Sequence, residues 1–134
     1  VLHSGCKVAV LALGSMVEIC AEVCSELQKE GIDSTFVNVR FVKPLDTALL
    51  DQLARNHSLV VTVEENVQNG FGQQVCGYME EHHPGIQVLP VAIPDRFVPH
   101  GGVDSLRVQL GLSANAIAEK IKKISGNYSE GIRE

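Results

Sequence analysis

The sequence is poor in aromatic residues and has no tryptophan, with two tyrosines and four phenylalanines among its 134 residues. Single-stranded nucleic acids bind on stacked aromatic side chains, so this composition argues against a surface for bases or sugars. The formal net charge of −5 points the same way, because nucleic-acid binding depends on cations that neutralise phosphates. No apolar run approaches the ~20 residues that cross a bilayer. We therefore expect neither nucleic acid nor a membrane as a partner.

Cysteine is also scarce and irregularly spaced. The four cysteines, at positions 6, 20, 24 and 76, form neither a CxxC pair nor a disulfide framework. A chain of this length can fold on its own core, so we expect a reducing compartment, the cytoplasm. Cys20 and Cys24 lie one helical turn apart, as a metal or redox pair would, but their apolar neighbours favour buried reduced thiols. The histidines have no partners at metal-ligand spacing, and no metal site is predicted.

The middle of the chain predicts a strand, a helix and a second strand in succession. Residues 35–39 and 59–63 are short β-branched and apolar runs, and residues 44–56 between them carry leucines at helical spacing. Both strands are almost continuously apolar, which indicates helices on both faces of the sheet and strands that run parallel. We predict that residues 8–13 form a further strand in the same parallel register.

Local signals predict the remaining elements. Ser15 and Glu18 have the spacing of a capping box, which predicts a helix from about residue 16 to residue 30. Pro90 interrupts an apolar run and so places its strand at a sheet edge or at a bulge. The other expected elements are an antiparallel stub before Ser4, a helix over 70–82, a strand over 86–93, a short helix near 104–110 and a helix over 114–124 capped by Ser113.

Together these elements predict an α/β fold. We expect a three-layer α/β/α domain with a mostly parallel five-stranded sheet, whose first strand is antiparallel and truncated. The domain is predicted to span residues 1–124. Residues 125–134 show no apolar periodicity, and we expect them to form a flexible tail.

Polar residues follow the predicted strands, and parallel strands bring them to one edge of the sheet. Ligands and partners of open α/β sheets usually meet this carboxyl edge. Glu64 and Glu65 are neighbours on a strand and point to opposite faces, so we do not expect a catalytic pair of carboxylates. One of them is expected to pair with Arg40 across adjacent strand ends, or with Arg96. Such a pair would serve either the structure or contact with a partner.

The glycines at positions 70 and 72 open a predicted helix and allow two interpretations. Backbone amides at a helix start can bind an anion such as phosphate. Alternatively, the glycines permit close packing at a turn, and we favour this second interpretation. A dinucleotide-binding fingerprint would have a third glycine at position 75, where this chain has Val75.

Four segments resemble one family. They are VRFVKPLD (39–46), VVTVEENVQNGFG (60–72), IPDRFVPHG (93–101) and LGLSANAIAEKI (110–121). In this order and spacing they resemble the C-terminal domain of the 1-deoxy-D-xylulose-5-phosphate synthase family, which is part of the transketolase superfamily. The sequence departs from the family at Gln73 and Gln74, where small residues are more usual. VEEN followed by a glycine-rich segment is also similar to transketolases and to the β subunits of 2-oxo acid dehydrogenases.

The resemblance implies a homodimeric enzyme that uses thiamine diphosphate and Mg2+. Such an enzyme decarboxylates pyruvate and transfers the two-carbon unit to glyceraldehyde 3-phosphate, and its product feeds isoprenoid, thiamine and pyridoxal synthesis. In the family the cofactor lies between the two preceding domains, which are the implied partners of this one. The sequence has no Gly-Asp dipeptide of the kind that holds the metal there. We therefore predict that this chain alone neither binds the cofactor nor catalyses a reaction.

No catalytic, cofactor-binding or metal residue is assigned by the resemblance. The residues that match family motifs at the carboxyl edge are candidate contacts to the preceding domains or to a second subunit: Arg40, Glu64, Glu65, Asn66, Arg96 and His100. Two other interpretations stay open. The chain could be a free-standing α/β binding module, or it could belong to a transketolase or a 2-oxo acid dehydrogenase β subunit.

Overall fold

The computed structural model describes residues 7–39, 45–65, 70–93 and 114–125. They contain a parallel sheet of four strands in the order β2-β1-β3-β4, formed by β1 (Lys7–Leu13), β2 (Thr35–Val39), β3 (His57–Glu65) and β4 (Gln87–Ile93). Every neighbouring pair is parallel, which confirms the strand directions predicted from the apolar runs. The expected antiparallel stub lies outside the described residues.

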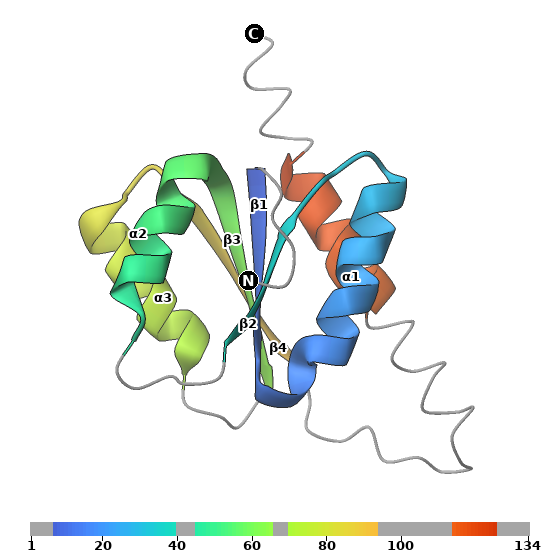
Figure 1. Ribbon diagram of the computed structural model, residues 1–134, viewed down its shortest axis with the longest axis horizontal. Coiled ribbons are helices and arrows are strands. Elements are labelled where there is room, and N and C mark those ends of the chain that lie inside the picture. The colour runs from blue at the N-terminus through green and yellow to red at the C-terminus, as the bar shows by residue number, and fades with distance from the viewer. Residues whose placement is uncertain (1–6, 40–44, 66–69, 94–113, 126–134) are drawn as a thin grey trace, which may run out of the picture.

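Helices cover both faces of the sheet, as Figure 1 shows. Helix α1 (Val17–Lys29) and a helix over residues 114–125 lie on one face, and helices α2 (Thr47–Asn56) and α3 (Phe71–His82) lie on the other. Alternate residues of each central strand enter two separate cores, so both faces must be apolar. Val61 joins the core under α1, for example, while Val60 joins the core under α2 and α3. The three-layer prediction is confirmed.

The order of the strands differs from one sequence-based assumption. Strands β2 and β3 follow each other along the chain, but β1 lies between them and pairs with both. Their carboxyl ends are therefore not adjacent. The prediction that Arg40 pairs with Glu64 or Glu65 across adjacent strand ends assumed that β2 and β3 are neighbours, and this assumption is wrong. Arg40 itself lies outside the described residues.

The start of α1 also differs from the prediction. A 3-10 turn over Gly14–Met16 precedes the helix, and the N-cap residue is Met16, without a side-chain cap hydrogen bond. Ser15 is therefore not the N-cap of α1, as the expected capping box required, because its backbone belongs to the 3-10 turn. The buried stripe is as predicted: Met16, Ile19, Cys20, Val23 and Leu27 are all buried.

The remaining elements agree closely with the sequence patterns. β4 is an edge strand of the four described, and Pro90 lies within it, opposite Thr62, where its missing N–H costs the sheet little. The last helix continues to residue 125. The expected helix near 104–110, the Ser113 cap and residues 126–134 lie outside the described residues. No helix in the described ranges is long and apolar enough to cross a membrane.

Candidate functional site

The carboxyl edge of the sheet is the site that the sequence singled out. Of the six candidate residues, the structure describes Glu64 and Glu65, which end β3. The other four lie outside the described residues: Arg40, Asn66, Arg96 and His100. Glu64 is buried and Glu65 is half-buried. Their side chains leave the strand on opposite faces, as expected for neighbours, so the structure does not bring them together.

Glu64 binds the start of helix α3 with both of its carboxylate oxygens. The N–H of Phe71 donates to Oε1 at 3.2 Å, and the N–H of Gly72 donates to Oε2 at 2.6 Å. These amides belong to the first turn of a helix, where N–H groups have no partner within the helix and the helix dipole favours a negative charge. Glu64 thus serves the backbone of its own chain rather than acting as an exposed ion-pair partner.

Gly70 and Gly72 suit the start of α3 for two different structural reasons. Gly70 is the N-cap of α3 and has φ +66°, a left-handed conformation that glycine adopts without strain. Gly72 packs against the sheet: a Cβ there would lie 2.8 Å from both Pro90 Cβ and Thr62 Oγ1, and 3.1 Å from Glu64 Oε2. The close-packing interpretation is confirmed for Gly72. The amides at the start of α3 do bind an acidic group, but this group is the Glu64 carboxylate of the same chain.

A second polar cluster joins α2 to α3 and was not found from the sequence. The Tyr78 hydroxyl donates to Asp51 Oδ1 at 2.7 Å, and His83 Nε2 lies 2.7 Å from the same oxygen. The hydrogen bonds from His83 and then from Tyr78 lower the pKa of Asp51, and the bond to Asp51 raises the pKa of Tyr78. The Tyr78 ring also lies 4.3 Å from the ring of His82. No local motif predicts a contact that forms only when two helices pack together.

A buried histidine lies at the opposite, amino edge of the sheet. His57 Nδ1 lies 2.8 Å from the carbonyl oxygen of Leu53, which can only accept, so Nδ1 carries the proton. In the neutral ring, Nε2 then accepts from the Thr35 hydroxyl at 2.6 Å. Both ring nitrogens have partners within the fold, and this histidine acts as a structural link from α2 to the strands.

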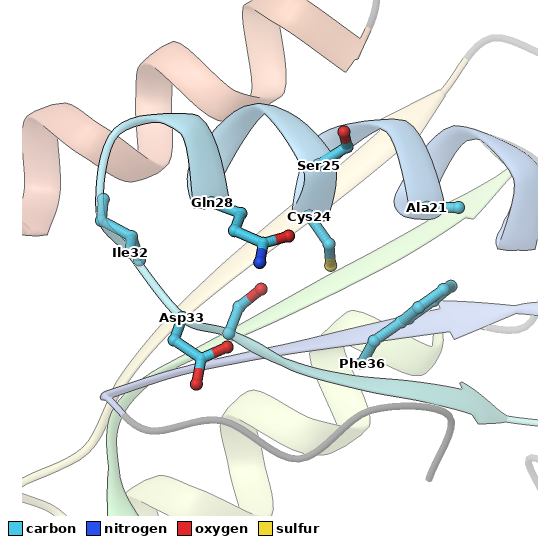
Figure 2. A pocket seen from close by; sticks show the side chains of 8 residues that line it. Ala21, Cys24, Ser25, Gln28, Ile32, Asp33 and Phe36 are labelled. Carbon is cyan, nitrogen blue, oxygen red and sulfur yellow. The ribbon is translucent and has the colours of Figure 1, made fainter.

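A groove of about 210 Å³ runs between α1 and β2. Figure 2 shows Cys24 and Gln28 reaching from α1 toward β2, with Phe36 on the strand side. Ligand pockets usually enclose about 300–1,000 Å³, so this groove is small for a substrate. Burial raises the pKa of the Cys24 thiol. A protonated thiol is a weak nucleophile, and the groove is not a candidate active site.

Three cysteines lie among the described residues. Cys20, Cys24 and Cys76 are free thiols, which agrees with the interpretation of reduced cysteines. Burial raises the pKa of Cys20, and nearby Cys24 raises it further. Within the described ranges, no group of three or more histidine, cysteine, aspartate or glutamate side chains could hold a metal ion. The described residues thus define the class of the protein by its fold, a parallel α/β sheet with helices on both faces.

Comparison with known proteins assigns the family. The sequence matches the family model described as "Transketolase, C-terminal domain" over residues 1–117. The chain therefore belongs to the transketolase C-terminal domain family. It is 44% identical over 90% of its length to 1-deoxy-D-xylulose-5-phosphate synthase of Lachnoclostridium phytofermentans, and 43% identical over 90% of its length to that of Dictyoglomus thermophilum.

A solved structure described as a split-gene transketolase, inactive β4 tetramer, is also similar. It superposes with a TM-score of 0.74 at 34% identity, over 92% of this chain and 40% of that chain. The present chain spans about 20% of the length of the two synthases. The greater part of each of those proteins has no counterpart in the 134 residues.

Proposed function

We propose that this chain is the C-terminal domain of a 1-deoxy-D-xylulose-5-phosphate synthase and that it braces an active site built by other domains of the same protein. The observation that carries the proposal is the 44% identity over 90% of the chain to a synthase of which it spans only 20%.

In the proposed full-length enzyme, thiamine diphosphate supplies the carbanion chemistry that removes CO2 from pyruvate and passes the two-carbon unit to glyceraldehyde 3-phosphate. Among the residues that the structure describes, none forms a site that fits that cofactor. The sequence has no Gly-Asp dipeptide, and the start of α3, which could hold a diphosphate, is filled by the Glu64 carboxylate. No step of the reaction is therefore assigned to side chains of this domain.

The full-length protein is proposed to be a cytoplasmic homodimer that contributes to isoprenoid and thiamine synthesis. The carboxyl edge is proposed to face the preceding domains or the second subunit, because partners of open α/β sheets meet that edge. Arg40, Glu65, Asn66, Arg96 and His100 are the proposed contacts, and Glu64 binds the start of α3 at the same edge. Similarity to the synthases over nearly the whole chain supports this placement.

Transketolase is the second candidate, favoured by the similarity to the split-gene transketolase. The two candidates differ in the two-carbon donor. A synthase releases CO2 from pyruvate, whereas a transketolase takes the unit from a ketose phosphate and releases no CO2.

The test uses the full-length protein, purified with thiamine diphosphate and Mg2+. We expect CO2 release from pyruvate that depends on glyceraldehyde 3-phosphate, with 1-deoxy-D-xylulose 5-phosphate identified by mass spectrometry. Transfer from a ketose phosphate without CO2 would assign the transketolase. Absence of both activities would reject both candidates.

The same preparation tests the supporting role of this domain. The 134-residue chain, titrated with thiamine diphosphate and Mg2+ in a calorimeter, should show no saturable heat. Saturable binding in the micromolar range would overturn the assignment of the cofactor to other domains.

A further inference from the structure

Glu64 is a charged side chain in an unusual position, because it lies on a central strand and is 8% exposed. Burying a carboxylate is costly unless hydrogen bonds replace its water. Here two backbone amides do so, one for each oxygen, at 3.2 and 2.6 Å. The carboxylate therefore occupies the position at a helix N-terminus that an external phosphate or sulfate takes in other proteins.

The packing around this carboxylate leaves it little freedom. Thr62 lies two residues earlier on the same face of β3, and Gly72 lies directly over both side chains. Pro90 of the neighbouring strand also lies against Gly72, where a Cβ would meet it at 2.8 Å. The first turn of α3 is thus held against two strands by shape and against Glu64 by charge.

This contact also joins two consecutive elements of the fold, β3 and α3. Glu64 precedes the carboxyl end of β3, and the residues that it binds begin the next helix. Glu64 therefore connects the carboxyl end of β3 with the start of α3. Both lie at the edge of the sheet that carries the candidate partner contacts.

We infer that Glu64 is a positioning residue: its buried carboxylate fills the anion site at the start of α3 and fixes the carboxyl edge in the shape that the remaining domains contact. The second half of this inference rests on the proposed function. The first half concerns this chain alone, and the two can be tested separately.

The experiment uses the full-length protein with Glu64→Ala and Glu64→Gln. Glu64→Ala removes a CH2–COO⁻ group, and acetate has the matching shape and charge. We expect synthase activity to fall about tenfold to hundredfold in both variants, because a displaced edge misplaces groups at a distance. Acetate should restore activity of Glu64→Ala severalfold with saturation, whereas acetamide, which is neutral, should not. The wild type should respond to neither.

The control is Glu26→Gln, which removes a half-exposed α1 carboxylate that bonds Lys29 at 3.2 Å. Its activity should stay within about twofold of the wild type, as exposed pairs contribute little. Unchanged activity of Glu64→Gln, or equal rescue by acetate and acetamide, would overturn the inference.

If the wild type has no synthase activity, the proposed function fails. The melting temperature of Glu64→Ala then tests whether the Glu64 carboxylate fills an anion site at the start of α3. A rise with acetate but not with acetamide supports the anion site, and no rise overturns it. If Glu64→Ala does not fold, the activity of Glu64→Gln tests the inference in its place. If the wild type is also inactive, the melting temperature of Glu64→Gln is compared with that of Glu26→Gln: a lower value for Glu64→Gln supports the anion site, and an equal value overturns it.

Discussion

Helix α3 contains two glycines whose replacement by alanine should have opposite effects. Gly77 lies in the exposed middle of the helix, and a Cβ there meets no atom within 4 Å. Alanine is a better helix former than glycine by about 1 kcal/mol, so Gly77→Ala should stabilise the protein by about 0.5–1 kcal/mol. Gly72 is buried in the first turn, and its new Cβ would lie 2.8 Å from both Pro90 Cβ and Thr62 Oγ1.

The cost of Gly72→Ala follows from these contacts. Overpacking of this kind costs about 1–3 kcal/mol. The same Cβ lies 3.1 Å from Glu64 Oε2, so moving the helix away from the sheet also weakens a hydrogen bond to a charged group, which contributes about 1.5–3 kcal/mol. After subtraction of the helix-propensity gain, we expect a net destabilisation of about 2–4 kcal/mol.

The assay is urea unfolding of the two variants and the wild type, followed by far-UV circular dichroism at equal protein concentration. The midpoint of Gly72→Ala should fall and that of Gly77→Ala should rise, with similar slopes. If Gly72→Ala is as stable as the wild type, or if both variants gain stability, the described packing of α3 against β3 and β4 is wrong.

Three further predictions concern other parts of the fold. Thr62 Oγ1 is buried without a hydrogen-bond partner, so Thr62→Val should raise the free energy of unfolding by about 1 kcal/mol, and a loss of stability would contradict this. Leu27 is fully buried in α1, and Leu27→Ala should cost about 2–5 kcal/mol in urea unfolding; a cost below 1 kcal/mol would refute its core position. The pKa of Asp51 is lowered from 3.8 by His83, so its contribution to stability is present above that value and lost as pH falls through the lower folded value. Asp51→Asn should make the free energy of unfolding depend less on pH in this acidic range. An unchanged pH dependence there would contradict the contacts of Asp51 with Tyr78 and His83.

Much of the fold could be predicted because its signals are local. Apolar β-branched runs gave the strands, leucine spacing gave α2, and Pro90 marked an edge strand, which is where β4 lies. The order of the strands could not be predicted in this way. Hydrophobic periodicity reports that a strand is buried on both faces, but it does not report which strand pairs with which. The central place of β1 was therefore missed, and with it the distance between the ends of β2 and β3.

The candidate site was harder to predict than the fold. The position of Glu64 at the carboxyl edge followed from the sequence, but its role did not, because its partners are backbone amides and amides have no signature in a sequence. The link from Asp51 to Tyr78 and His83 was missed for a similar reason, since the two partners lie 27 and 32 residues after Asp51 in the chain. The capping box at Ser15 shows the reverse case, a local pattern overruled by the 3-10 turn before α1.

The occupation of the α3 start limits what this domain can contribute to a phosphate-dependent enzyme. A helix N-terminus at the carboxyl edge is the usual place for a phosphate in an α/β fold, because free amides and the helix dipole both favour an anion there. In this chain the Phe71 and Gly72 amides already bind Glu64, and Gly72 leaves no space for a larger group between the helix and the sheet. A diphosphate would have to displace a covalently tethered carboxylate, whose effective concentration is far above that of any free ligand. The start of α3 is therefore not free for a diphosphate, which agrees with the proposal that the cofactor is held by other domains.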